Sequence, residues 1–298
     1  MFHIAQNTSE ALLNNQFIYN RDRISRINIL FKNRNRANSI DDYNLFNSLN
    51  SICYDTTRTF PQYEPNQRVV DSKNSLLYII KSLRLGDFSS YCDVGCGMGY
   101  YPRAAAELNC KKSVGIDNND SRFHKDYLHD YKGSLRFICT DISDDTHDIG
   151  KFKLVTSFAA FEHFSNPYGM LNSMAKLVEK NGYLYINFSP IYRSTDGYHM
   201  YRSIQIPWYH LFFTEKVCQK YYNDNNLIED SKINYFNEWS ALDFLVLFSN
   251  YTELRLITLQ PRWNFRHLWY AKLYPHMLPP YGIEELMVGG FEVLYKKC

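Results

Sequence analysis

The feature that most constrains the fold is a short apolar run that leads directly into a glycine-rich turn. Residues 91–94 have the length of a strand, and Gly95, Gly97 and Gly99 follow within five residues. Glycine allows positive φ angles and places no Cβ between the backbone and a ligand. A strand, a glycine turn and a helix in this order predict a site where the backbone closely approaches a bound cofactor at the helix N-terminus.

The rest of the central region alternates between short apolar runs and segments with helical periodicity. This alternation predicts an α/β fold with a Rossmann-like, doubly wound, mostly parallel sheet. The expected further strands are 113–116, 135–139, 152–158 and 183–188, and the expected helices are 72–83, 101–108 and 168–179.

The regions on either side of this pattern are predicted to be additions to the sheet. Residues 1–70 read as a helical N-terminal extension, in which the polar segment 1–36 is expected to act as a lid. Residues 71–298 form the predicted main domain, with an aromatic and helical acceptor-binding insertion at about 190–250. Two late strands, 253–259 and 291–295, are expected to finish the sheet, with a second helical insertion at 263–274 between them.

Acidic residues follow three successive predicted strands. Asp93, Asp117 and Asp141 come at the ends of the first, second and third runs. The glycine spacing is G-x-G-x-G rather than the dinucleotide pattern G-x-G-x-x-G, and a carboxylate beside the turn would repel a pyrophosphate. Asp93 is instead suited to an ammonium group, Asp117 to ribose hydroxyls and Asp141 to an adenine amino group. Each acid alone could equally be a helix cap or a surface residue.

With these motifs, residues 70–190 resemble the class I S-adenosylmethionine-dependent methyltransferases. The run from Asp93 to Gly99 is similar to the glycine-rich first motif of that family, and Asp117 and the pair Asp141-Ile142 match its ribose and adenine positions. The segment FAAFEHFSNP at 158–167 is similar to the one after its fourth strand. The resemblance implies S-adenosylmethionine as cofactor, held by Asp93, Gly95, Cys96, Gly97, Gly99, Asp117, Asn118, Asp141, Ile142, Phe158 and Glu162.

Histidines are the candidates for the base that removes a proton from a hydroxyl acceptor, because a neutral imidazole accepts a proton near pH 7. His199 and His210 are preferred over His163, since they lie in the insertion where the acceptor is expected to enter, and His267 is a further candidate. The runs 197–201 and 207–213 also resemble, more weakly, methyltransferases associated with bacterial surface polysaccharides. The alternative interpretation is that His210 and Trp208 pack the insertion against the sheet.

A metal-dependent mechanism is not expected. Divalent ions in such enzymes need clustered carboxylates at the transfer point, and there Glu162 stands alone. Asp144, Asp145 and Asp148 form an acidic group after the third strand, which reads as a solvated loop on the adenine side.

Composition limits the partners and the location. The net charge is +2, which gives no strong case for binding of nucleic acid. Residues 21–36 are locally basic, since their only acidic residue is Asp22 and their basic residues are Arg21, Arg23, Arg26, Lys32, Arg34 and Arg36. This segment could attract a phosphate or form a solvated helix face. The 45 Tyr and Phe residues could line a pocket or fill a core. Seven scattered cysteines without C-x-x-C, no signal-peptide pattern and no membrane-spanning run predict a cytoplasmic protein.

Three functions remain open from the sequence. The first is O-methylation of a sugar, a nucleotide-linked sugar or a similar small hydroxylated molecule that carries a phosphate handle, which would fit polysaccharide biosynthesis. The second is RNA modification, for which the basic segment and exposed aromatic rings would serve. The third is a cofactor-binding module without catalytic activity. The oligomeric state is not indicated by the sequence.

Overall fold

The computed structural model describes residues 21–31, 40–54, 64–120, 123, 134–142, 149–227, 237–275, 278 and 281–298. They form two compact units, each built from three stretches of the chain. The sheet unit comprises described residues within 61–189, 242–262 and 290–298, and the helical unit comprises those within 1–60, 190–241 and 263–289. No helix among the described residues is both long enough and apolar enough to span a bilayer.

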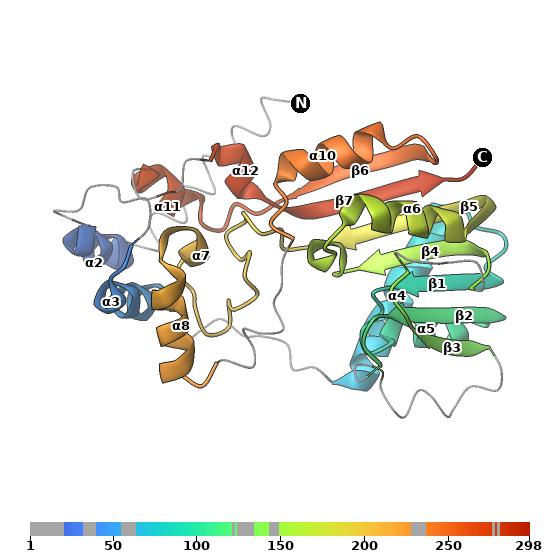
Figure 1. The fold of residues 1–298 in the computed structure, drawn as a ribbon, viewed down its shortest axis with the longest axis horizontal. Coiled ribbons are helices and arrows are strands. Elements are labelled where there is room, and N and C mark those ends of the chain that lie inside the picture. The colour runs from blue at the N-terminus through green and yellow to red at the C-terminus, as the bar shows by residue number, and fades with distance from the viewer. Residues whose placement is uncertain are drawn as a thin grey trace. The chain divides into compact units, whose positions relative to one another are not determined.

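The sheet unit is built on seven strands in the order β3-β2-β1-β4-β5-β7-β6 (Figure 1). The pairs β1–β2, β1–β4, β2–β3 and β4–β5 are parallel, and β7 is antiparallel to β5. The prediction of a doubly wound, mostly parallel sheet is confirmed. The strands are β1 (Ser90–Val94), β2 (Lys112–Asp117), β3 (Leu135–Cys139), β4 (Phe152–Phe158), β5 (Val178–Phe188), β6 (Arg255–Trp263) and β7 (Val288–Lys296).

Helices cover both faces of this sheet. On one face, α4 (Pro65–Ser82) and α5 (Tyr100–Glu107) pack on side chains that include Leu154 and Tyr185. Because side chains alternate along a strand, Phe188 points to the opposite face. There α10 (Ala241–Asn250) brings Phe244 and Phe248 against Phe188, with ring centroids 4.9 and 6.2 Å from it, and α6 (Pro167–Leu177) connects β4 to β5.

Several boundaries differ from the sequence prediction, and three of the larger differences have a physical reason. Helix α4 begins at Pro65 rather than at residue 72, because proline is favoured at the first helical position. The first turns of this helix have no apolar periodicity, so the sequence pattern did not predict them. Strand β5 begins at Val178, and its pairing with β4 shifts between Phe152 and Leu154, so an irregular stretch interrupts the apolar pattern. Strand β6 lies at the edge of the sheet, where Pro261 does not have to donate a hydrogen bond, and it runs on to residue 263. Helix α6 ends at Leu177, two residues early.

The helical unit has a core of its own. Its helices are α2 (Arg21–Phe31), α3 (Tyr43–Cys53), α7 (Tyr209–Phe212), α8 (Glu215–Asp224), α11 (Leu268–Leu273) and α12 (Ile283–Met287). Fully buried side chains such as Phe46, Trp208 and Tyr270 fill the core, so many of the aromatic residues of the chain serve packing. Asn50 of α3 cross-links the unit: its amide donates to the Ser203 carbonyl at 3.0 Å and accepts from the Gln205 backbone N–H at 2.9 Å.

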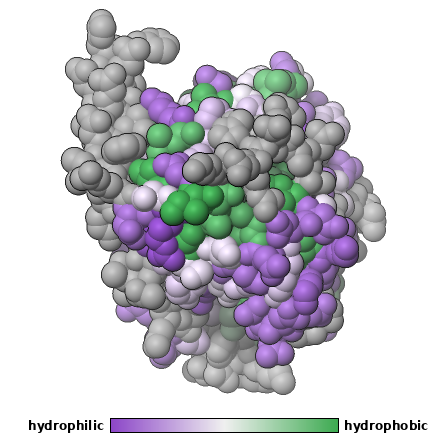
Figure 2. All heavy atoms as spheres, turned by 90° about the vertical axis from the view of Figure 1, so that its left-hand side faces the viewer, coloured by the Kyte–Doolittle hydropathy of each residue, from purple (hydrophilic) through white to green (hydrophobic). Residues whose placement is uncertain are grey.

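The surface of the helical unit is mixed in character. Figure 2 shows a hydrophobic area among hydrophilic residues on the side that lies at the left of Figure 1. The exposed large hydrophobic side chains of this unit include Ile29, Tyr54 and Leu273. Of the predicted basic segment, Arg26 forms an exposed ion pair with Asp22 at 4.0 Å, while Lys32, Arg34 and Arg36 lie outside the described residues. The predicted lid also lies outside them, apart from α2, and stays a prediction.

Candidate active site

The glycine turn after β1 is held against the neighbouring strand. Gly95, Gly97 and Gly99 have φ angles of 73°, 52° and 83°. The backbone N–H groups of Gly95 and Cys96 both donate to the carbonyl of Ile116 in β2, at 2.8 and 2.9 Å. A Cβ added at Gly97 would meet no atom within 4 Å, so the backbone is open to a ligand there. The turn therefore has the shape that a cofactor-binding loop requires.

Asp117, at the end of β2, ties this turn to the sheet. Its Oδ2 accepts a hydrogen bond from the Gly97 N–H at 2.9 Å, and its Oδ1 accepts one from the Asn119 N–H at 3.1 Å. Each carboxylate oxygen has two lone pairs, so each can accept one more hydrogen bond. Two ribose hydroxyls fit that remaining capacity. Asn118, the next residue of the predicted set, is exposed.

Asp93 lies beneath the turn and is 2% exposed. Its Oδ1 accepts a hydrogen bond from the Thr156 hydroxyl at 2.7 Å. Because the single Thr156 hydroxyl proton is used in this bond, the Tyr91 hydroxyl, 2.6 Å from the Thr156 Oγ1, must be the donor to Thr156. Burial raises the pKa of Asp93 to about 8, the Thr156 hydrogen bond opposes this, and the charge of Asp117 adds to it. A cation bound nearby would favour the carboxylate form.

The adenine-side pair is also at the carboxyl edge of the sheet. Asp141 follows β3 and is exposed, whereas Ile142 is 1% exposed. Thr140 between β3 and this pair donates its backbone N–H to the Asp117 carbonyl at 3.0 Å. The acidic group of Asp144, Asp145 and Asp148 lies outside the described residues.

The segment after β4 carries a buried carboxyl group. Glu162 belongs to the short helix η3 (Phe161–His163) and is 1% exposed. Neither of its carboxylate oxygens has a hydrogen-bond donor in ideal geometry among the described side chains and backbone groups. Burial raises its pKa to about 8, and the backbone N–H groups of Glu162 and Ser189 act in the opposite direction.

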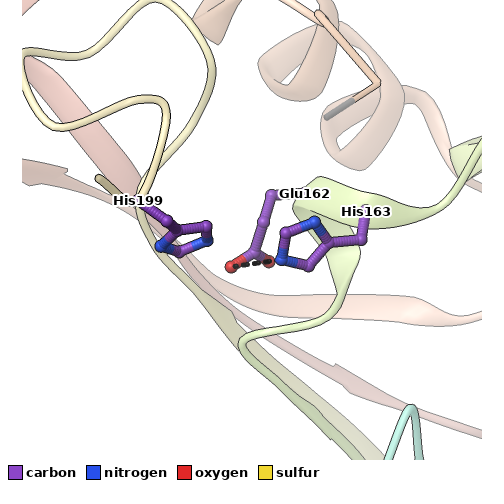
Figure 3. Close-up of side chains that lie close together, drawn as sticks. All are labelled: Glu162, His163 and His199. Atoms are coloured by element: carbon purple, nitrogen blue, oxygen red, sulfur yellow. Dashed lines mark ion pairs between the residues drawn. The ribbon is translucent and has the colours of Figure 1, made fainter. Parts of the chain in front are cut away.

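His163 is the titratable side chain paired with this carboxyl group within the sheet unit. Figure 3 shows both side chains, with the His163 Nε2 4.0 Å from the Glu162 Oε1. His199, drawn in the same figure, belongs to the helical unit and is described with it below. At the end of β4, Phe158 stacks on Tyr101 of α5 with ring centroids 3.7 Å apart and planes within 4°. Phe158 is thus the last residue of β4, and Glu162 and His163 follow its carboxyl end.

His210, one of the predicted bases in the helical unit, is held by a backbone carbonyl group. Its Nε2 is 2.6 Å from the Tyr192 carbonyl oxygen, which can only accept, so Nε2 carries the proton and Nδ1 has the lone pair. The Nδ1 atom is buried and has no hydrogen-bond partner among the described residues. Burial lowers the pKa of His210 to about 4, and the Tyr192 carbonyl opposes this shift. The rings of Tyr192, Tyr198 and Tyr209 surround it at 5.1 to 5.9 Å.

The other two histidines of this unit lie in different surroundings. His199 occupies a turn with φ of 52°, and its backbone N–H donates to the Asp196 carbonyl at 3.2 Å. His267 caps α11, with its ring 6.4 Å from that of Trp208.

Comparison with known proteins identifies the central part of the sheet unit. Residues 92–186 match the family model described as a methyltransferase domain. The matched span runs from β1 into β5 and contains the glycine turn, Asp117, Asp141 and Glu162. The central part of the sheet unit is therefore similar to a methyltransferase domain. The strand order and the site at the carboxyl ends of β1 and β2 agree with this assignment.

Curated relatives match the methyltransferase domain over part of their length. A ubiquinone biosynthesis O-methyltransferase of Coxiella burnetii is 30% identical over 108 residues, which are 36% of this chain and 45% of the relative. One of Burkholderia vietnamiensis is 26% identical over 133 residues, 41% of this chain and 56% of the relative. The chain thus spans about half the length of the curated relatives it matches.

Solved structures give a weaker likeness. The plantazolicin methyltransferase BpumL in complex with SAH is 16% identical, with a TM-score of 0.48 over 78% of this chain and 85% of that one. The magnesium protoporphyrin IX methyltransferase of Synechocystis is 13% identical, with a TM-score of 0.44 over 97% and 100% of the two chains. The likeness to methyltransferases therefore rests on the sequence matches.

Several residues that shape the site carry no sequence motif. Thr156 and Tyr91, which hold Asp93, and the Tyr192 carbonyl, which orients His210, are ordinary residues of strands and loops. The even spacing of Thr156 and Phe158 along β4 indicates side chains on one face, but no local pattern says which acid that face meets.

Proposed function

We propose that the chain is an S-adenosylmethionine-dependent O-methyltransferase of a small hydroxylated molecule, such as a sugar or a nucleotide-linked sugar. The observation that carries the proposal is the turn at Gly97, which is open above the backbone and tied beneath to the Asp117 carboxylate. Support for oxygen as the methylated atom comes from the curated relatives, whose names state O-methylation.

Different residues around the turn bind different parts of the cofactor. Asp117 accepts hydrogen bonds from the ribose hydroxyls, and Asp141 with Ile142 binds the adenine. Asp93 and Glu162 are buried carboxyl groups without an arginine or lysine partner among the described residues, so they suit a cationic methionine end. When bound, S-adenosylmethionine supplies an electrophilic methyl group on a sulfonium centre.

His210 is the preferred base for the acceptor hydroxyl. Its protonated Nε2 is held by the Tyr192 carbonyl, so the lone pair of Nδ1 is oriented to accept the proton of the hydroxyl as the new bond forms. A pKa of about 4 keeps the imidazole neutral at pH 7, and the acceptor proton becomes strongly acidic only in the transition state. His199 and His163 remain the alternatives in that order.

The cellular setting is part of the same proposal. All seven cysteines are free, which fits a reducing cytoplasm. We propose a phosphate-bearing sugar as acceptor and polysaccharide biosynthesis as the process, on the strength of the tyrosine-rich surroundings of His210.

The test measures release of S-adenosylhomocysteine by the full chain with a panel of nucleotide sugars and small phenols, and it locates the new methyl group by mass spectrometry. Turnover with a hydroxyl acceptor is expected, and His210→Ala should lower kcat by about 10² to 10⁴ while cofactor affinity is retained. His199→Ala and His163→Ala serve as matched variants. RNA is tested in parallel as an acceptor. Methylation of RNA and of no small molecule, or cofactor binding without any turnover, would refute the proposal.

A further inference from the structure

The carboxyl edge of the sheet has a second half, in which the proposed cofactor residues use only the end of β4. Asp93, Asp117 and Asp141 lie at the ends of β1, β2 and β3, on one side of the point where the strand order reverses. Strands β4, β5 and β7 lie on the other side of β1. In open α/β sheets ligands bind along this edge. A second ligand beside the cofactor would therefore meet the side chains of these three strands.

Three polar side chains gather there on the face that carries α4 and α5. Asn187, the second-last residue of β5, is directly opposite Glu292 of β7. The amide nitrogen of Asn187 donates to the hydroxyl oxygen of Tyr185, two residues earlier in β5, at 3.2 Å. Burial raises the pKa of Tyr185 to about 12, and the charge of Glu292 and a hydrogen bond to it add to this shift. The three residues form one polar string across two strands.

Glu292 is the chemically unusual member of the string. It is only partly exposed, in the middle of a strand that is otherwise mainly apolar. It forms no ion pair within the described part of the sheet unit. With Tyr185 as its donor, the carboxylate has further lone pairs for a ligand. A partly buried carboxylate with spare acceptor capacity in a strand is costly for folding alone, which points to a binding role.

Aromatic rings border the polar string. Phe158 of β4 lies 5.7 Å from Tyr185, at an angle of 50° between the rings, and its other neighbour is the stacked ring of Tyr101. Tyr101 is the second residue of α5, so the stack lies two residues after Gly99 of the cofactor turn. Flat apolar rings beside a carboxylate and an amide are the combination that recognises a ring with hydroxyl groups.

We infer that Tyr185, Asn187 and Glu292 form an acceptor subsite that binds a ring with two adjacent hydroxyl groups. Glu292 accepts from one hydroxyl, and the Asn187 carbonyl oxygen accepts from the other. The Phe158 edge contacts the ring. This inference rests on the proposed function, since it assigns the part of the acceptor that is presented to the methyl donor. These three side chains are positioning residues.

The experiment uses the full chain saturated with S-adenosylhomocysteine and two probes that carry the same diol on different rings. Catechol and methyl α-glucopyranoside are titrated separately, with ligand-observed NMR as the readout. One of the two is expected to bind, which distinguishes an aromatic from a sugar acceptor. Glu292→Gln should weaken that binding by about tenfold or more, the scale of a hydrogen bond to a charged group.

Tyr183→Phe is the matched control for Tyr185→Phe. Both substitutions remove one hydroxyl from the same face of β5, but Tyr183 lies two residues farther from the carboxyl edge, beneath the Lys296 ammonium group. Tyr185→Phe should weaken probe binding several-fold and Tyr183→Phe should leave it unchanged. In Glu292→Gln the unfolding temperature should not fall and the affinity for S-adenosylhomocysteine should stay the same, which separates binding from folding.

Binding of neither probe to the parent chain, or equal binding by Glu292→Gln, Tyr185→Phe and Tyr183→Phe, would overturn the subsite. Failure of the proposed function has a different signature. In that case the parent chain binds the probe and the Glu292→Gln and Tyr185→Phe variants bind it more weakly, but no hydroxyl acceptor is methylated. Absence of S-adenosylhomocysteine binding to the parent chain would also refute the proposed function.

Discussion

Two glycines of the cofactor turn are predicted to tolerate a methyl group in opposite ways. Gly97 and Gly99 both have positive φ, so alanine at either position costs about 1 to 2 kcal/mol of backbone strain. At Gly99 the new Cβ would also lie 2.4 Å from the Phe137 ring, and overpacking of this kind costs about a further 1 to 3 kcal/mol. At Gly97 the new Cβ meets no atom within 4 Å.

The expected result is a separation of stability from affinity. Gly99→Ala should lower the free energy of unfolding by about 2 to 5 kcal/mol, a large part of the stability of a typical domain. Gly97→Ala should lower it by only about 1 to 2 kcal/mol, but it should weaken S-adenosylmethionine binding tenfold or more, because its Cβ fills the space above the turn. Urea denaturation and isothermal titration measure the two quantities.

Two controls make the comparison specific. Gly86→Ala adds a methyl group outside the turn, where it meets no atom within 4 Å, and should change stability by less than about 0.5 kcal/mol. Phe137→Leu should recover part of the loss caused by Gly99→Ala, as a favourable coupling in a double-mutant cycle. Equal destabilisation by Gly97→Ala and Gly99→Ala, or no recovery with Phe137→Leu, would show that the ring contact is not the cause.

Three further predictions follow from the site. Asp117→Ala should weaken S-adenosylmethionine binding by about 1.5 to 3 kcal/mol, whereas replacement of its exposed neighbour in Asn118→Ala should not; unchanged affinity in the folded Asp117 variant contradicts the ribose role. Burial raises the pKa of Asp93 and Glu162 from 3.8 and 4.5 to about 8, so between about pH 4 and 8 the folded chain holds protons that the unfolded chain releases. The unfolding free energy of the cofactor-free chain should therefore fall as pH rises, by up to about 1.4 kcal/mol per pH unit for each carboxyl, and an equal slope in Asp93→Asn would rule this out. Because burial lowers the pKa of His210 to about 4, kcat should stay level from pH 8 to pH 5; an acidic limb near pH 6.5 that disappears in His199→Ala would assign the base to His199 instead.

The strands of the sheet could be predicted because their signals are local. Both the buried strand β4 and the edge strand β3 are short apolar runs, and they have the predicted bounds of 152–158 and 135–139. The boundaries that were wrong are those where tertiary contacts outweigh local pattern. The irregular start of β5 is specified by its pairing with β4, and the polar first turns of α4 are helical without an apolar face of their own.

The site divides in the same way. The glycine turn and Asp117 could be found from the sequence, because a turn and the residue after a strand are defined by their neighbours in the chain. The partners of Asp93 and His210 could not, since Thr156 is 63 residues from Asp93 and Tyr192 is 18 residues from His210. Nor could the string of Tyr185, Asn187 and Glu292, which exists only because β7 pairs with β5 in one register.

The sequence by itself therefore determined the class of fold, the cofactor turn and the carboxylates at the strand ends, all of which depend on residue order along one element. Only the tertiary structure decided which groups are buried together. Burial removes water from Asp93, Glu162 and His210 and shifts the pKa of each in the direction that favours the neutral form. Strand register decides which side chains of β5 and β7 lie opposite each other. These properties depend on contacts between residues far apart in the chain, which no local pattern specifies.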